Sequence, residues 1–166
     1  MHFFNRRRPF KYFTILREPL NQAISYYFFI KGSERWRRKH PMLEETKKFS
    51  LVDFTERHRN LQCMTLAGIP WNRIFSRNSR IILNLAKKHL FYKLDMFGIL
   101  EQMDEFQDKI ESRYGWTKNS VYALNTKTRV RPKVADLTES QVIRMKELLS
   151  LDIELYEEAK KRLKTI

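Results

Sequence analysis

Cysteine, glycine and proline are scarce in this sequence of 166 residues, with one, four and five copies. The single cysteine, Cys63, cannot form a disulfide within the chain. No histidine or second cysteine stands at metal-ligand spacing from it, so a disulfide scaffold and a zinc site are both excluded. The scarcity of turn-forming residues, beside abundant Leu, Ile, Glu, Lys and Arg, favours long helices over an all-β fold. We expect one domain over residues 1–166 with one hydrophobic core.

Long apolar runs and an excess of acidic residues are also absent. No stretch approaches the roughly 18 apolar residues of a membrane span, and the basic start has no signal-peptide core. Lys and Arg outnumber Asp and Glu by 33 to 19, which gives a net charge of +14, and the first hundred residues carry +13 of it. Such a surface attracts phosphate or sulfate groups and favours a polyanionic partner. A solvated basic face that keeps the protein in solution explains the same charge equally well.

The pattern of apolar residues predicts two short strands among several helices. Residues 10–16 are aromatic and β-branched, as a buried strand requires, and residues 90–94 have the same character. Pro19 suits the first turn of a helix over residues 20–31, which Gly32 ends. Further helices are expected over residues 51–68, 78–89 and 101–114 and from residue 137 onward. Because a two-stranded sheet is marginal alone, we also expect partner strands that this chain does not supply.

The strongest local motif is Arg17-Glu18-Pro19, directly after the first predicted strand. In α/β folds ligands gather at the carboxyl ends of strands and at the following helix N-terminus, where free N–H groups and the helix dipole favour a phosphate. Arg17 stands at that place, and its planar guanidinium can bind a phosphate through two N–H groups. Ser25, in the early turns of the helix, offers a hydroxyl to the same anion. The residues alone leave open that Arg17 only marks the strand end and that Ser25 faces solvent.

Residues 10–19, followed by Ser25-Tyr26-Tyr27, resemble the 3′-phosphate-binding motif of carbohydrate sulfotransferases, in particular the heparan sulfate 2-O-sulfotransferase-like and bacterial members. That signature runs strand, Arg-Asp-Pro and then Ser-X-Tyr at this spacing; here Glu18 replaces the Asp and Gln22 replaces a frequent Arg. The resemblance implies that Arg17 and Ser25 bind the 3′-phosphate of the donor, 3′-phosphoadenosine 5′-phosphosulfate, with no metal. It also implies an α/β fold, the helix-rich C-terminal portion of a P-loop-type three-layer sulfotransferase domain with few parallel strands.

Weaker similarities to the family follow in the family's order along the chain. They are Asn60-Leu61-Gln62, Gly98-X-X-Glu101 and Asp152-X-X-Leu155-Tyr156-X-X-Ala159. Each is also compatible with ordinary core residues, but their agreement in order supports the resemblance.

The resemblance assigns two further roles. Lys127 and Thr128, within residues 125–132, fall where the family places a loop over the nucleotide, although a basic surface loop explains them equally well. His2 resembles a histidine that precedes the phosphate-binding strand and acts as general base toward the acceptor hydroxyl, a task that an imidazole titrating near neutral pH can perform. Its position beside the first residue favours a mobile side chain instead.

The basic segment over residues 33–41 is the candidate acceptor site. Arg35, Arg37 and Arg38 surround Trp36, and guanidinium groups match the carboxylates and sulfates of an acidic sugar chain while an indole stacks on a sugar ring. We therefore expect an acidic or neutral carbohydrate as partner, besides the nucleotide. The same segment would suit nucleic acid through phosphate contacts and base stacking.

The implied function is transfer of a sulfuryl group from 3′-phosphoadenosine 5′-phosphosulfate to a carbohydrate hydroxyl. The family's 5′-phosphosulfate-binding loop has no counterpart upstream of Phe10, so we expect an N-terminally truncated chain with impaired activity. One alternative is a basic helical nucleic-acid-binding protein without catalysis, which lacks any known nucleic-acid motif. Another is a non-catalytic remnant that associates with a second chain. The bacterial resemblance favours a cytoplasmic location, or the Golgi lumen for a eukaryotic full-length precursor.

Overall fold

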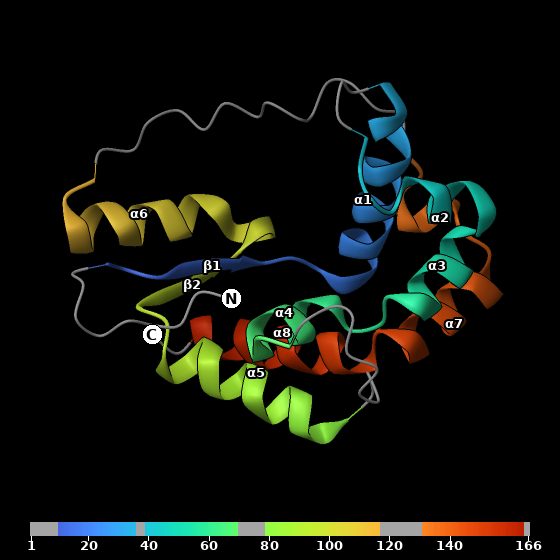
Figure 1. Cartoon of the computed structure of the whole chain (residues 1–166). Helices are drawn as coiled ribbons and strands as arrows, with labels where there is room; N and C mark the ends of the chain where they lie inside the picture. Colours follow the sequence, from blue (N-terminus) through green and yellow to red (C-terminus); the bar gives the residue numbers. More distant parts are fainter. Residues whose placement is uncertain (1–9, 36–38, 70–78, 117–130, 165–166) are drawn as a thin grey trace.

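The computed structural model describes residues 10–35, 39–69, 79–116 and 131–164. Two short strands, β1 (Phe13–Leu16) and β2 (Met96–Ile99), pair in parallel, with Phe13 beside Met96 and Leu16 beside Ile99. The helices of the described residues are α1 (Pro19–Gly32), α2 (Leu43–Lys48), α3 (Leu51–Arg57), α4 (Leu61–Ala67), α5 (Arg80–Tyr92), α6 (Met103–Tyr114), α7 (Glu139–Leu148) and α8 (Ser150–Leu163), with short 3-10 turns at Ser33–Arg35, Leu100–Gln102 and Val134–Asp136. The expected helix-rich α/β arrangement with few parallel strands is confirmed (Figure 1).

The first strand and the helix after it lie close to where the sequence placed them. The strand is shorter than predicted and begins at Phe13 rather than Phe10. Pro19 occupies the first turn of α1, and the carboxylate of Glu18 accepts hydrogen bonds from the N–H groups of Leu20 and Asn21. This side chain caps the helix N-terminus, and α1 ends at Gly32 as expected.

The second predicted strand is wrong. Residues 90–94 close α5, and β2 follows at Met96–Ile99. Leu90 is buried with Ile82, Leu83 and Ala86, and the spacing of these four residues places them on one side of a helix. A short apolar run fits a helix end and a strand equally well, and the helical stripe on which Leu90 lies decides between them.

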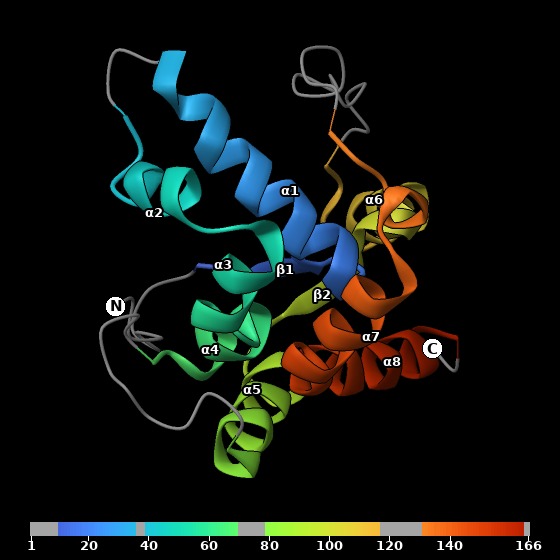
Figure 2. The same ribbon diagram turned by 90° about the vertical axis from the view of Figure 1, so that its right-hand side faces the viewer.

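Helices lie on both faces of the small sheet (Figures 1 and 2). Leu16 and Ile99 are buried in the core cluster formed with α4, α5 and α8. On the other face α6 lies against β2, where a Cβ atom added to Gly98 would come within 2.5 Å of Cδ2 of Phe106. Only glycine allows α6 to approach the strand this closely. Ile15 alternates with Leu16 along β1 and so points to the face of α6, where it is 40% exposed.

A second part of the core lies where α1 leaves the sheet, among α2, α3 and α7 (Figure 2). Leu20 and Ile24 of α1 pack with Met145 and Leu149, and further along the same helix Tyr27 and Ile30 pack with Phe54 of α3. These contacts hold the helix that carries Ser25.

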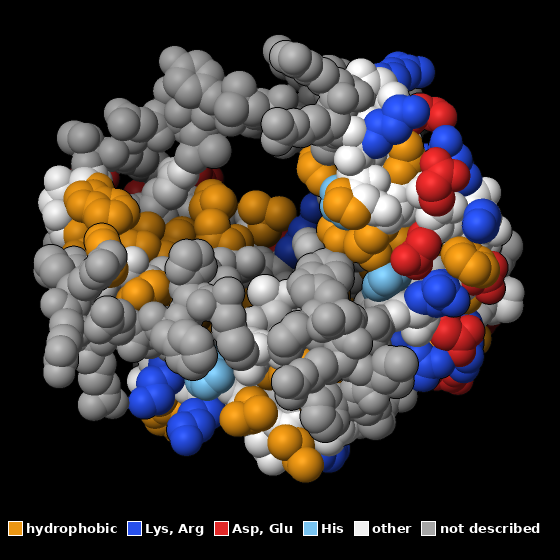
Figure 3. All heavy atoms as spheres, in the orientation of Figure 1, with side chains coloured by type: hydrophobic (Ala, Val, Ile, Leu, Met, Phe, Trp, Pro, Cys, Tyr) orange, Lys and Arg blue, Asp and Glu red, His pale blue; other side chains and the backbone are white. Residues whose placement is uncertain are grey.

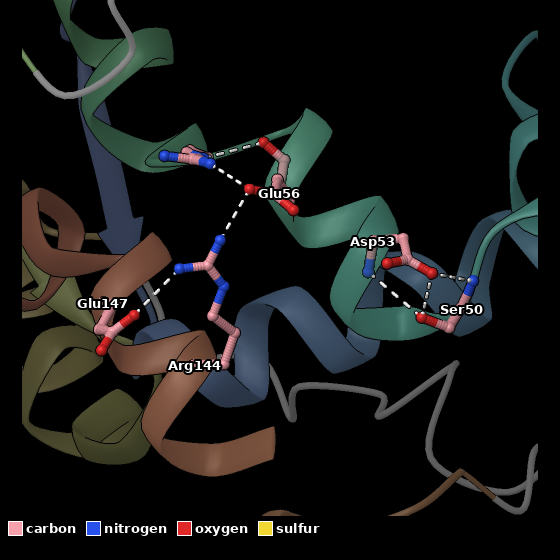
Figure 4. A network of polar contacts seen from close by, with 6 residues as sticks. Ser50, Asp53, Glu56, Arg144 and Glu147 are labelled. Atoms are coloured by element: carbon pink, nitrogen blue, oxygen red, sulfur yellow. Dashed lines mark hydrogen bonds and ion pairs between the residues drawn. The ribbon is translucent and has the colours of Figure 1, made fainter. Parts of the chain in front are cut away.

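Residues 51–68, predicted as one helical stretch, form two helices. Asn60 lies between α3 and α4 with φ of 51°, in the left-handed region, which breaks the helix. At the start of α3, Ser50 and Asp53 form a reciprocal capping box (Figure 4). Arg144 of α7 then joins Glu56 of α3 at 2.8 Å. None of the helices in the described part of the chain is long and apolar enough to cross a membrane.

Candidate functional site

Arg17 follows directly on β1, and its backbone is held by one side chain. The Oε1 atom of Gln62 accepts a hydrogen bond from the Arg17 N–H at 3.0 Å, and the Nε2 atom of Gln62 donates to the Arg17 carbonyl at 2.9 Å. Gln62 belongs to α4, so a side chain from a distant segment holds the residue that follows β1. The backbone of Arg17 is therefore fixed, and its guanidinium projects from a rigid point.

The guanidinium of Arg17 has few partners among the described residues. Its Nε atom is buried and has no hydrogen-bond partner there, and no ion pair joins Arg17 to a carboxylate of that part of the chain. Burial lowers the pKa of Arg17, the charge of Arg131 lowers it further, and Glu101 and Glu18 act in the opposite direction. Because an arginine keeps its proton at neutral pH, this is a partly desolvated positive charge beside a second one.

Arg131 contacts one of the two sequence-predicted phosphate ligands. Its Nη1 atom donates a hydrogen bond to the Oγ atom of Ser25 at 2.5 Å. Its positive charge also acts on Arg17, where it lowers the pKa of the guanidinium. Arg131 belongs to the basic segment 125–132, in which only Lys127 and Thr128 were predicted to contact the nucleotide. Its place next to Pro132, at the end of that segment, was the only feature of the sequence that set it apart.

The N-terminus of α1 is not an open anion site, which corrects the expectation from the sequence. Pro19 has no N–H group, and those of Leu20 and Asn21 donate to the Glu18 carboxylate at 3.1 and 2.8 Å. The N–H of Gln22 donates to the Glu18 carbonyl. Since all of these donors are used within the chain, an anion here must be held by side chains.

The surface between α6 and α1 is hollowed and partly apolar. Figure 3 shows hydrophobic side chains along a hollow between α6 and α1, with a basic side chain at its α1 end. Ile15, two residues before Arg17 on β1, is 40% exposed, and Leu100 after β2 is 41% exposed. A ligand that joins an anionic group to a flat apolar ring fits a surface of this kind.

Arg35 does not lie with Arg17. It follows α1, whose 14 residues span about 20 Å, and Arg17 precedes the same helix. Ser33, in the same basic segment, is fully buried, and its Oγ atom accepts a hydrogen bond from the N–H of His40. The other candidates, His2, Arg37, Arg38, Lys127 and Thr128, lie outside the described residues.

Neither a candidate metal centre nor an ionised thiol is found among the described residues. They contain no group of three or more His, Cys, Asp or Glu side chains that could hold a metal ion. Burial, with Asp152 nearby, raises the pKa of the Cys63 thiol far above its ordinary range, so Cys63 stays protonated in the core. Comparisons of the chain with family models, curated proteins and solved structures found no match. The site is therefore interpreted from its own geometry, as a place for one multiply charged anion.

Proposed function

We propose that this chain binds a nucleotide through its 3′-phosphate, using Arg17, Ser25 and Arg131. One observation carries the proposal: Arg131 donates to the Ser25 hydroxyl on α1, its charge also acts on Arg17 at the carboxyl end of the preceding parallel strand, and the buried Nε of Arg17 has no partner in the described residues. Two like charges repel each other, and a bound anion would offset that repulsion by attracting both. A phosphate dianion would accept hydrogen bonds from both guanidinium groups and from the hydroxyl.

The same proposal extends to the carbohydrate sulfotransferase family and its P-loop-type fold. In that activity an acceptor hydroxyl attacks the sulfur of 3′-phosphoadenosine 5′-phosphosulfate, the bond between the sulfur and the phosphate oxygen breaks, and the hydroxyl proton passes to a base. Adenosine 3′,5′-bisphosphate is the leaving group of this transfer, and its 3′-phosphate remains bound to Arg17, Ser25 and Arg131. The parallel pairing of β1 and the place of Arg17 after it support this assignment. His2 as base and Arg35, Arg37 and Arg38 as acceptor ligands belong to the same proposal.

The test is calorimetric titration of the chain with adenosine 3′,5′-bisphosphate, with adenosine 5′-monophosphate as the ligand that lacks the 3′-phosphate. We expect the bisphosphate alone to bind, and Arg17→Ala to weaken binding at least about 100-fold, because a charged hydrogen-bonding partner of a phosphate is lost. Arg113→Ala, an equal change at the exposed end of α6, is the matched control and should leave the affinity unchanged.

Two results would count against the proposal. Equal binding of both nucleotides would show that the 3′-phosphate is not recognised, and full binding by the Arg17→Ala variant would place the anion elsewhere. If single-stranded RNA bound instead, with steep salt dependence and no effect of Arg17→Ala, the nucleic-acid alternative would replace the nucleotide site.

A further inference from the structure

Two helices that begin far apart in the sequence cap each other. The Oδ1 atom of Asn60 accepts hydrogen bonds from the N–H groups of Leu151 and Asp152, in the first turn of α8, at 3.1 and 3.2 Å. In return, the carboxylate of Asp152 accepts from the N–H groups of Gln62 and Cys63, in the first turn of α4, at 3.1 and 2.7 Å. Asn60 is fully buried and Asp152 is 2% exposed. The starts of α4 and α8 are thus fixed to one another.

These reciprocal caps are connected to Arg17 through Gln62. Gln62, whose N–H is held by Asp152, is the residue whose side chain pairs with both the N–H and the carbonyl of Arg17. The next residue, Glu18, donates its N–H to Oε1 of Glu101 at 3.1 Å, and the Tyr156 hydroxyl donates to Oε2 of the same carboxylate at 3.2 Å.

Both supports of the Arg17-Glu18 backbone therefore rest on α8. Asp152 and Tyr156 are four residues apart and lie on one side of that helix. One anchors Gln62, which holds Arg17, and the other anchors Glu101, which holds Glu18.

We propose that Gln62 is the positioning residue of the anion site, held in place by Asp152 of α8, and that Glu101 with Tyr156 forms a second support. The inference rests on the proposed binding of a 3′-phosphate by Arg17. None of the supporting side chains touches the anion; they set the point from which the guanidinium reaches it. Preorganising a cation in this way spares the entropy that an unsupported strand end would lose on binding.

A purely structural role for these bonds would predict something different. Capping α4 needs only the carboxylate of Asp152, and the side chain of Gln62 makes no contribution to that cap. Its amide group instead turns to Arg17, at a position where β1 has already ended. The two bonds of the Gln62 amide are the feature that a positioning role explains and helix capping does not.

The test compares Gln62→Met, which keeps the length of the side chain but neither bond, with Gln107→Met, the same change on α6 outside this network. Three quantities are measured for each: the dissociation constant of adenosine 3′,5′-bisphosphate, the deuterium exchange rate of the Arg17 amide, and the melting temperature. We expect Gln62→Met to raise the dissociation constant about tenfold and to speed exchange of the Arg17 amide about tenfold, since each reflects loss of hydrogen bonds at one residue. Gln107→Met should change neither the dissociation constant nor the exchange rate of the Arg17 amide.

The outcomes separate this inference from the proposed function. A lowered melting temperature with unchanged affinity would make Gln62 a structural residue and overturn the inference. Failure of the unsubstituted chain to bind the bisphosphate would overturn the proposed function and the inference together. Tyr156→Phe removes a single hydroxyl and is the second variant should Gln62→Met not fold: a rise of about threefold in the dissociation constant supports the inference, and unchanged affinity refutes it.

Discussion

The buried carboxylate of Asp152 makes stability depend on pH in an unusual direction. Burial raises the pKa of Asp152 from its ordinary value of 3.8 to about 6, although the N–H groups of Cys63 and Gln62 favour the ionised form. A folded-state pKa above the unfolded one means that the stability contributed by this group is fully present below about pH 3.8. It is lost as pH rises through about 6.

The size of the effect follows from the two pKa values. The full interval from 3.8 to about 6 corresponds to about 3 kcal/mol of unfolding free energy. Between about pH 5 and about pH 7.5 the share of this amount that is lost is about 1.4 kcal/mol. Other carboxylates act in the opposite sense: the Tyr12 N–H and then Lys11 hold the pKa of Asp95 below its ordinary value, and Lys87 does the same for the pKa of Glu154. The contribution of Asp152 must therefore be isolated as a difference between two chains.

Urea unfolding of the unsubstituted chain and of Asp152→Asn, over that pH range, provides the difference. The amide introduced by this substitution cannot ionise, so the unsubstituted chain should lose about 1.4 kcal/mol relative to the variant as pH rises from about 5 to about 7.5. A difference independent of pH would refute the reasoning. That result would show that the two N–H groups outweigh burial, because a pKa at or below the ordinary value leaves Asp152 ionised in both folded and unfolded chains above about pH 5.

Two further predictions concern single backbone positions. Gly98→Ala should destabilise the fold by about 1–3 kcal/mol, because its Cβ would lie 2.5 Å from the Phe106 ring; chemical denaturation should show a smaller cost in a Phe106→Ala background, and an equal cost would place the strain elsewhere. Asn60→Ala loses the cap of α8 and leaves an alanine at φ of 51°, whereas Asn60→Gly loses only the cap. The alanine variant should therefore be less stable by about 1 kcal/mol in the same assay, and equal stabilities would contradict this account.

Local signals in the sequence predicted much of the helical framework. Pro19 lies at the start of α1, where its missing N–H costs nothing, and Gly115 ends α6 in the left-handed conformation. The strand after α5 was misplaced because apolar character at residues 90–94 does not distinguish a helix end from a strand. The contact between Gly98 and Phe106, which helps to locate β2, involves two elements and is not visible locally.

The candidate site was predicted only in part. Arg17 and Ser25 follow from the motif, and of these two the structure shows Ser25 in contact with Arg131. Position alone could not show that Glu18 would fill the helix N-terminus, since that depends on one side-chain rotamer. The positions that weakly resemble the family, Asn60, Gln62, Glu101, Asp152 and Tyr156, proved to be members of one hydrogen-bonded network. Each is an ordinary polar residue by itself, and only tertiary contacts bring them together.

The exchange of caps between α4 and α8 has a consequence for how the chain folds. Asn60 and Asp152 are separated by 92 residues, and chains emerge from the ribosome with the N-terminal part first. Until α8 is made, the amide groups at the start of α4 lack their acceptor and Gln62 lacks its anchor. The strand that carries Arg17 also needs β2 as its partner, so its surroundings become fully ordered only after α8 has been synthesised, and folding should be slow.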